Sequence, residues 1–367
     1  MIIHPHLFVK GGGERLTKIL AEGLRSLGDE VSVLTSKISG GFTGFEGVET
    51  FFIERFPQSS GIPLVDSFTS MATSIRETIR KFSPEIVVSM TEDLANLGIC
   101  KLVDRKLKTV QYVHFPVEEE ARAVGSERYV QFFRFPEWFN KCFLWAVDRL
   151  LCNSKYTREA VERFWGRKAR VVYPALDPSF KDEPENLGKP RENLILCVGR
   201  FTKLKRQDFL VKIFRKIKEK VKDAKLVLAG FPDERHRDFY EKLLRLVKET
   251  KDVTVVEDPS DRELAKLYLE AKVFCHPRIG EHFGLTPVEA MRQGAIVVAY
   301  NAGGIREVIS HGRDGFLANN DREYLSLTLK ALRLKGGEWV KMQKAAVRKA
   351  GRFSPERFVR DFRKTFI

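Results

Sequence analysis

Two glutamates, Glu281 and Glu289, stand eight positions apart in the stretch GEHFGLTPVEA, residues 280–290. A buried carboxylate is costly unless it is paired, so two of them around a glycine-containing loop suggest a polar ligand. Gly284 would let main-chain N–H groups approach that ligand, and a phosphate could rest on them at the start of the next helix. A structural role competes for Glu289, because the T-P-x-E sequence that begins at Thr286 is also a capping-box pattern.

A cluster of cations follows an apolar segment in GRFTKLKRQD, residues 199–208. Arg200 ends a predicted strand, and Lys203 and Lys205 lie in the loop before the next predicted helix. Cations at this end of a strand suit a diphosphate, and an arginine can bind it through two hydrogen bonds. The alternative is an ordinary basic loop, and the residues alone do not choose between the two lysines.

A glycine-rich segment, VKGGGERL at residues 9–16, directly follows the first predicted strand. Glycines there allow a close backbone approach, and the helix predicted over 14–27 offers free N–H groups to an anion. The spacing is not G-x-G-x-x-G, and no acidic residue ends the second predicted strand, which disfavours a dinucleotide site. A plain connection between a strand and a helix is the competing interpretation.

Two further segments place a histidine or a pair of glycines at the end of a predicted strand. His114 ends the apolar strand in QYVHFP, where a structural histidine is an equally good interpretation. Gly303 and Gly304 follow another apolar run, and Glu307 is expected inside the helix after them.

No D-x-D pair occurs in the chain, so a carboxylate pair holding a divalent metal is not supported. Cationic side chains and helix dipoles would then have to neutralise a leaving diphosphate.

These residues require a scaffold of strands and helices, and the alternation of apolar, strand-length runs with amphipathic stretches supplies one. The pattern occurs twice, and it predicts two doubly wound parallel sheets with ligands at the carboxyl ends of the strands. The expected strands are 30–36, 84–90, 108–114, 148–154, 193–200, 224–230, 253–258, 271–277 and 295–301. The expected division is a domain over 1–175, a linker over 176–191, a domain over 192–350, and a C-terminal helix over 351–367. The default ligand site is the cleft between the two domains.

Composition narrows the class of protein. The 367 residues are 43% hydrophobic and 31% charged, and no apolar run reaches the length of a membrane span. Five scattered cysteines without a C-x-x-C pair, and a start without a signal-peptide pattern, indicate a reduced, cytoplasmic protein. The net charge of +15 favours a phosphorylated ligand, an anionic membrane or nucleic acid. We find no nucleic-acid-binding motif and therefore discount nucleic acid.

Four segments in this order, GGGERL, QYVHFP, GRFTKLK and EHFGLTPVEAMRQGAIVVAYNAGGIREVI, resemble the family 4 retaining glycosyltransferases of GT-B fold. The resemblance covers nearly the whole chain, and IHPHLFVKGGGERL with QYVHFP looks most like the mannosyltransferases of dolichol-linked, polyprenyl-linked or cell-surface glycan assembly. It implies two Rossmann-like domains facing across a cleft. It also implies metal-independent transfer of a hexose, mannose from GDP-mannose, to a lipid-linked glycan at the cytoplasmic face of a membrane. A UDP-sugar donor with a soluble acceptor, and a GT-B nucleotide-sugar epimerase, remain alternatives.

The resemblance also implies a role for each residue singled out above. Gly12 and Gly13 would face the donor diphosphate, and His114 would lie beside the transferred sugar. Arg200 and Lys205 would bind the diphosphate and stabilise its departure.

The two glutamates would hold opposite ends of the donor. Glu281 would bind hydroxyls of the sugar, and Glu289 the hydroxyls of the ribose. Main-chain N–H groups near the sugar and phosphates would come from Phe283, Gly284 and Leu285.

Two segments concern the ends of the fold and a membrane. The segment FSPERFVRDF, residues 353–362, resembles the helix by which many GT-B enzymes return to their first domain. Residues 128–151 interleave aromatic side chains with Arg and Lys, which suits either an interface with anionic lipid or a buried core.

Overall fold

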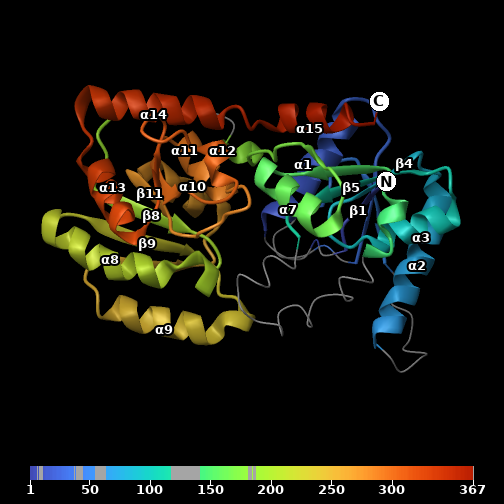
Figure 1. Ribbon diagram of the computed structural model, residues 1–367, viewed down its shortest axis with the longest axis horizontal. Helices are drawn as coiled ribbons and strands as arrows, with labels where there is room; N and C mark the ends of the chain where they lie inside the picture. Colours follow the sequence, from blue (N-terminus) through green and yellow to red (C-terminus); the bar gives the residue numbers. More distant parts are fainter. Residues whose placement is uncertain are drawn as a thin grey trace. The chain divides into compact units, whose positions relative to one another are not determined.

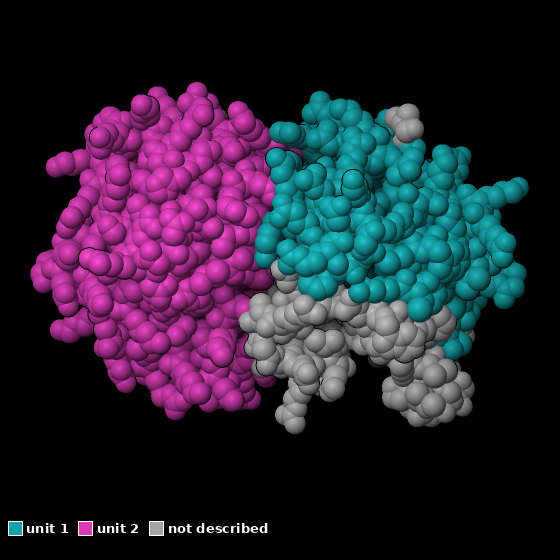
Figure 2. Space-filling model, in the orientation of Figure 1, with its two compact units in different colours: residues 1–175, 355–367 teal, residues 176–354 magenta. Residues whose placement is uncertain are grey.

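The computed structural model describes residues 1–5, 7, 11–36, 38, 44–53, 63–116, 141–180, 184 and 187–366. These residues form two compact units (Figure 2). The first contains Met1–Ala175 and Pro355–Ile367, and the second contains Leu176–Ser354. Each unit is a parallel sheet with helices packed against it, so the predicted α/β fold with two Rossmann-like units is confirmed.

The sheet of the first unit has seven strands in the order β3-β2-β1-β4-β5-β6-β7, all parallel. Their bounds are β1 Ile2–Ile3, β2 Ser32–Thr35, β3 Glu49–Phe52, β4 Ile86–Ser89, β5 Lys108–Val113, β6 Arg149–Cys152 and β7 Arg170–Val171. The four strands expected in this unit between residues 30 and 154 are present, and β3 and β7 at the two edges are additional.

The first strand is shorter than the sequence predicts. It ends at Ile3, well before Gly11, so the prediction that the glycine segment directly follows a strand is wrong. Pro5 gives the physical reason, because proline has no N–H to donate to a sheet ladder. Helix α1, Gly12–Ser26, then begins inside the glycine run.

The sheet of the second unit has six parallel strands in the order β10-β9-β8-β11-β12-β13. Their bounds are β8 Leu194–Val198, β9 Lys225–Gly230, β10 Val253–Glu257, β11 Val273–His276, β12 Ile296–Tyr300 and β13 Phe316–Ala318. All five expected strands are present, with β13 added at one edge. The strand order reverses between β8 and β11, which is where ligands bind in open α/β sheets.

Helices flank both sheets (Figure 1). Those of the first unit, besides α1, are α2 Pro63–Phe82, α3 Ala95–Val103, α7 Lys155–Trp165 and α15 Pro355–Arg363. Those of the second unit are α8 Gln207–Lys220, α9 Arg237–Lys248, α10 Asp261–Glu270, α11 Leu285–Arg292, α12 Ile305–Val308, α13 Asp321–Arg333 and α14 Gly336–Ala350. Figure 1 shows α8 and α9 on one face of the second sheet and α10 and α11 on the other. Coverage of both faces explains why the central strands are continuous apolar runs rather than alternating ones.

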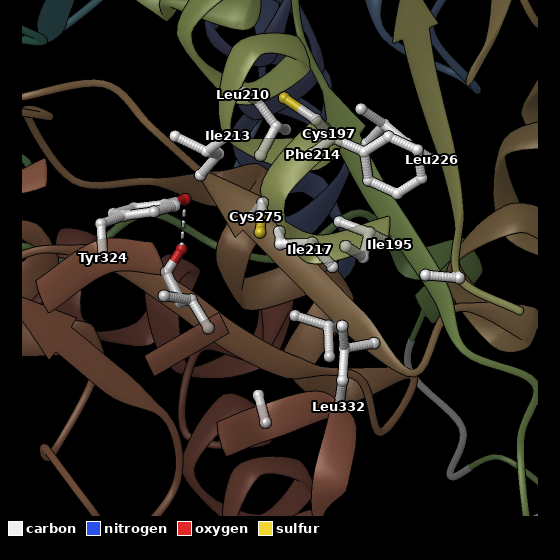
Figure 3. Packing of buried hydrophobic residues seen from close by; sticks show 14 of the residues in the cluster. Ile195, Cys197, Leu210, Ile213, Phe214, Ile217, Leu226, Cys275, Tyr324 and Leu332 are labelled. Atoms are coloured by element: carbon white, nitrogen blue, oxygen red, sulfur yellow. Dashed lines mark hydrogen bonds between the residues drawn. The ribbon is translucent and has the colours of Figure 1, made fainter. Parts of the chain in front are cut away.

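The core of the second unit is made where strands meet α8. Figure 3 shows Ile195 and Leu226 from β8 and β9 with Leu210, Phe214 and Ile217 of the helix, all fully buried. Apolar residues recur along α8 at helical spacing, so one face is buried while Lys212, Lys216 and Lys220 are exposed. This packing fixes the strand ends that carry the candidate site.

Most of the cysteines have buried thiols. Cys152, Cys197 and Cys275 are buried, whereas Cys142 is exposed. Burial raises the pKa of the Cys275 thiol to about 12, so it stays protonated at neutral pH.

The last helix, α15, belongs to the first unit and packs on α1. Phe358 and Phe362 lie against the ring of Tyr112, with centroids 6.0 Å away in each case. Arg363 donates two hydrogen bonds of 2.9 Å to Asp29, in the loop that follows α1. Residues 176–180, at the start of the expected linker, lie in the second unit, where Phe180 is buried.

Candidate active site

A single carboxylate, that of Glu281, joins two loops at the carboxyl ends of β8 and β11. Its Oε2 atom lies 2.8 Å from Nζ of Lys205 and 2.8 Å from Nε2 of His276. Nε of Arg278 is 3.8 Å from the same oxygen, and Oε1 accepts a hydrogen bond of 3.1 Å from the backbone N–H of His282. Glu281 is only 8% exposed, so these contacts replace the water that a carboxylate needs.

The neighbours of Glu281 decide its charge. Burial alone would raise the pKa of Glu281, but Lys205, Arg278 and the hydrogen bond from His276 outweigh burial and hold that pKa well below its ordinary value. Burial lowers the pKa of His276 and of Lys205, against the opposing effect of Glu281. Because an ionised carboxylate only accepts hydrogen bonds, the neutral imidazole of His276 carries its proton on Nε2.

The two glycines after β12 let the Glu281 loop pack so closely. The backbone N–H of Gly304 donates to the carbonyl of Glu281 over 2.7 Å. A Cβ atom on Gly303 would lie 2.3 Å from that carbonyl oxygen, and one on Gly304 would lie 1.9 Å from the carbonyl oxygen of His282. Glu307 lies inside α12, as predicted.

The start of α11 differs from the capping-box pattern. Gly284 is the N-cap with φ +100°, a conformation that favours glycine, and Leu285 is the first helical residue. No side chain caps this helix, so the capping interpretation of Thr286 and Glu289 is wrong. Glu289 is 7% exposed and accepts a hydrogen bond of 2.7 Å from the hydroxyl of Tyr268. Phe283 buries its ring against Phe353, so only its backbone is offered to a ligand.

The cationic loop after β8 separates its three candidate cations. Lys205 reaches Glu281, whereas Lys203 is exposed. Arg200 lies 3.4 Å from Asp233 and its side chain is 41% exposed. A Cβ on Gly230 would lie 2.1 Å from the carbonyl oxygen of the glycine before Arg200, which shows how closely the ends of β8 and β9 pass. The structure therefore brings Lys205, rather than Lys203, to the carboxylate.

In the first unit, the structure brings His114 and Gly13 together. A Cβ on Gly13 would lie 3.4 Å from Nε2 of His114, so the first turn of α1 lies directly against the imidazole. The backbone N–H of His114 donates to Glu92 over 3.1 Å, and its carbonyl accepts from Asn153 over 2.7 Å. Gly12 begins α1 and is exposed.

Three site residues of the second unit were not predicted from the sequence: His276, Arg278 and Tyr268. His276 is the last residue of β11 and Arg278 follows it in CHPRIGEH, so polar residues at a strand's carboxyl end were the available signal. Tyr268 lies inside α10, where an isolated aromatic residue indicates only a core position.

Two properties bear on metals and membranes. Within the described ranges, no group of three or more His, Cys, Asp or Glu side chains is placed to hold a metal ion. Nor does any described helix combine the length and apolar composition that crossing a bilayer requires. Residues 128–140 lie outside the described residues. In the described remainder of that stretch, Phe143 and Leu144 are partly buried against the core and Trp145 is 59% exposed.

Two family models match the chain, one for each unit. Glycosyltransferase Family 4 matches residues 10–180, and Glycosyl transferases group 1 matches residues 179–349. Their junction lies within a few residues of the boundary between Ala175 and Leu176.

Individual proteins agree with these matches. The alpha-1,3/1,6-mannosyltransferase ALG2 of Mus musculus is 25% identical over 356 residues, covering 89% of this chain and 85% of that protein. A GDP-Man:Man(3)GlcNAc(2)-PP-Dol alpha-1,2-mannosyltransferase of Dictyostelium discoideum is 30% identical over 233 residues, covering 59% of this chain and 46% of that protein.

Solved structures show the same fold. Anabaena Alr3699/HepE, in complex with UDP and glucose, superposes with a TM-score of 0.80 at 17% identity, covering 100% of this chain and 98% of that chain. Sucrose-phosphate synthase from Thermosynechococcus elongatus gives a TM-score of 0.79 at 20% identity, covering 100% and 97%. The two family matches, the two parallel sheets and these neighbours together establish that the chain belongs to the glycosyltransferases of GT-B fold, with a Family 4 first domain and a group 1 second domain.

Proposed function

We propose that this glycosyltransferase moves mannose from GDP-mannose to a lipid-linked glycan, with retention of configuration and without a metal cofactor. The observation that carries the proposal is the cluster of Lys205, His276 and Arg278 on Glu281, next to the N-terminus of α11. Such a cluster supplies cations and main-chain donors for a diphosphate, and a carboxylate for sugar hydroxyls. The proposed donor and acceptor rest on the relatives, since those that match most of the chain are mannosyltransferases.

The diphosphate is bound by charge and by main-chain donors. Arg200 has an exposed guanidinium, and Lys205 can turn from Glu281 to a phosphate oxygen, since its side chain is 20% exposed. The N–H groups of Phe283, Gly284 and Leu285 lie at the positive end of the helix dipole and donate to the phosphates and the sugar.

The sugar and the ribose are bound by carboxylates. Glu281 has acceptor capacity left on Oε1, where it takes one backbone hydrogen bond, and this oxygen accepts from sugar hydroxyls. Glu289 accepts from the ribose hydroxyls. In the first unit, Gly12 and Gly13 bind the diphosphate, and His114 contacts the sugar beside the reacting carbon.

Transfer is a substitution on one face of the sugar. The bond between the anomeric carbon and the diphosphate oxygen breaks, and an acceptor hydroxyl oxygen bonds to that carbon from the same side. The departing phosphate takes the acceptor's proton, and Arg200 and Lys205 stabilise the negative charge that develops on it. Preorganised electrostatics, rather than an enzyme nucleophile, lowers the barrier.

The test is donor selection followed by product analysis. GDP should raise the melting temperature more than UDP or ADP, and a ligand present at 100 times its dissociation constant should stabilise by about 2.7 kcal/mol. With GDP-mannose, labelled mannose should pass to a polyprenyl-diphosphate oligosaccharide. Selective stabilisation by UDP with transfer to a soluble sugar, or release of free nucleotide with an epimerised sugar, would refute the proposal in favour of the corresponding alternative.

A further inference from the structure

We infer that His276 and Tyr268 are positioning residues for the two glutamates of residues 281–289. His276 would hold Glu281 in place for the sugar of the donor, and Tyr268 would hold Glu289 in place for the ribose. The inference rests on the proposed function, because it takes Glu281 to bind the sugar and Glu289 to bind the ribose. It adds two residues whose chemistry is confined to fixing those carboxylates.

His276 holds Glu281 from inside the sheet. It is the last residue of β11, is 2% exposed, and donates to Oε2 of Glu281 over 2.8 Å. Its ring stacks on Phe274, with centroids 6.5 Å apart and planes 13° apart, so the imidazole has a fixed orientation.

Lys205 contacts the same Oε2 atom of Glu281, but its side chain is more exposed than that of His276 and can move more freely. Its side chain is 20% exposed, against 2% for that of His276, and it comes from the loop after β8 rather than from a strand. When a diphosphate draws the lysine away, the histidine contact remains. Glu281 therefore keeps its position and its charge while the lysine serves the leaving group.

Tyr268 holds Glu289 in a parallel way. It is fully buried in α10, and its hydroxyl donates to Oε2 of Glu289 over 2.7 Å. Its ring lies 5.7 Å from that of Phe274, the residue that also stacks on His276. Phe274 therefore packs against both His276 and Tyr268, the hydrogen-bond partners of Glu281 and Glu289.

The two positioning residues should have different kinetic signatures. His276→Leu removes the donor to Glu281, so kcat should fall about 10-fold or more, the usual loss for an orienting partner, while nucleoside diphosphate affinity stays within about 3-fold. His276→Gln restores an N–H donor of similar reach and should recover most of kcat. Tyr268→Phe should weaken nucleoside diphosphate affinity about 10-fold, with a smaller change of kcat at saturating donor.

Matched controls separate positioning from stability. Tyr324→Phe removes another fully buried phenol in the same unit, one that donates to a backbone carbonyl, and His311→Leu removes a histidine that bonds backbone. Both should leave kcat and nucleotide affinity unchanged even where the melting temperature falls. If His276→Leu does not fold, His276→Asn takes its place, because its amide is too short to reach Glu281.

Calorimetry with GDP and UDP, and steady-state kinetics with the donor they identify, decide the matter alongside Glu281→Ala and Glu289→Ala. Normal kcat in folded His276→Leu, no recovery in His276→Gln, or normal nucleotide affinity in Tyr268→Phe would overturn the inference, provided that the alanine variants are impaired. If the alanine variants also behave as wild type, or neither nucleotide binds wild type, the proposed function itself has failed.

Discussion

Replacing Glu281 with glutamine should destabilise the second unit and free its cations at the same time. Glutamine has nearly the same shape, so the change removes a charge rather than volume. Lys205 and Arg278 then lose the carboxylate that now balances their charges, and His276 faces a neutral amide. The effect on folding and the effect on ligand binding should therefore have opposite signs.

The size of the destabilisation follows from burial. Removing one partner of a buried ion pair costs about 3–5 kcal/mol, because the other charge remains without compensation. The side chain of Lys205 is 20% exposed and can turn towards water, which favours the lower end, about 3 kcal/mol. For a unit of this size each kcal/mol shifts the melting temperature by about 2–4 °C, so we expect a fall of about 6–12 °C.

The stability difference between wild type and Glu281→Gln should depend on pH in a definite direction. Burial alone would raise the pKa of Glu281, but its cationic neighbours hold it below the ordinary 4.5 in the folded state. The ionised carboxylate therefore stabilises the fold fully above pH 4.5, and this contribution is lost as pH falls through the folded pKa. The stability difference between wild type and Glu281→Gln should shrink as the pH is lowered below 4.5.

Urea melts of both proteins, at neutral pH and below pH 4.5, measure the destabilisation and its decrease at low pH. The same melts with saturating nucleoside diphosphate measure the stabilisation by ligand. Without ligand the variant should be about 3 kcal/mol less stable. With ligand it should gain more stability than wild type, because Lys205 no longer has to leave a carboxylate. Equal stability without ligand, or a smaller gain with it, would refute the account of Glu281 as the counter-charge of this cluster.

The remaining predictions concern the metal, the diphosphate, the ribose and the membrane. Activity should survive EDTA, and complete loss restored by Mg²⁺ or Mn²⁺ would show that transfer needs a metal. Arg200→Ala and Lys205→Ala should each lower kcat by about 10² or more, and normal turnover in both folded variants would remove the diphosphate assignment. Glu289→Ala should weaken nucleoside diphosphate binding in calorimetry, whereas an unchanged affinity would leave it only a structural role with Tyr268. The protein should sediment with anionic vesicles at low salt and less so as salt rises, and its remaining in the supernatant at low salt would favour a soluble acceptor.

Sequence pattern predicted the central strands because they are buried on both faces and therefore apolar throughout. Strands β8, β11 and β12 are runs of this kind. The edge strands β3, β7 and β13 were not predicted. Two-residue β7 is too short to show a period, and β3 is only partly buried, with both of its end residues exposed.

The sequence predicted part of the candidate site, but it missed His276, Arg278 and Tyr268 and did not predict which side chains pair. Glu281, Lys205 and Arg200 stand at strand ends, and strand ends of a parallel sheet meet at one edge. That Lys205 rather than Lys203 turns inward depends on the short helical turn Lys203–Lys205, in which Lys203 is exposed and Lys205 contacts Glu281. The capping-box interpretation is wrong because Gly284, with its positive φ, is the N-cap, so the helix begins at Leu285, before Thr286.

The pairing of Lys205 with Glu281 bears on how such a site can both bind and release a diphosphate. Because the lysine already has a counter-charge, a phosphate that takes it replaces one ion pair with another. The net gain is then smaller than the gross attraction between lysine and phosphate, since the first pair must be broken. The same exchange would run in reverse after transfer, because Glu281, still held by His276, would again be available to pair with the lysine. A carboxylate anchored on one side and shared on the other would therefore keep the cation available without making the nucleotide product hard to release.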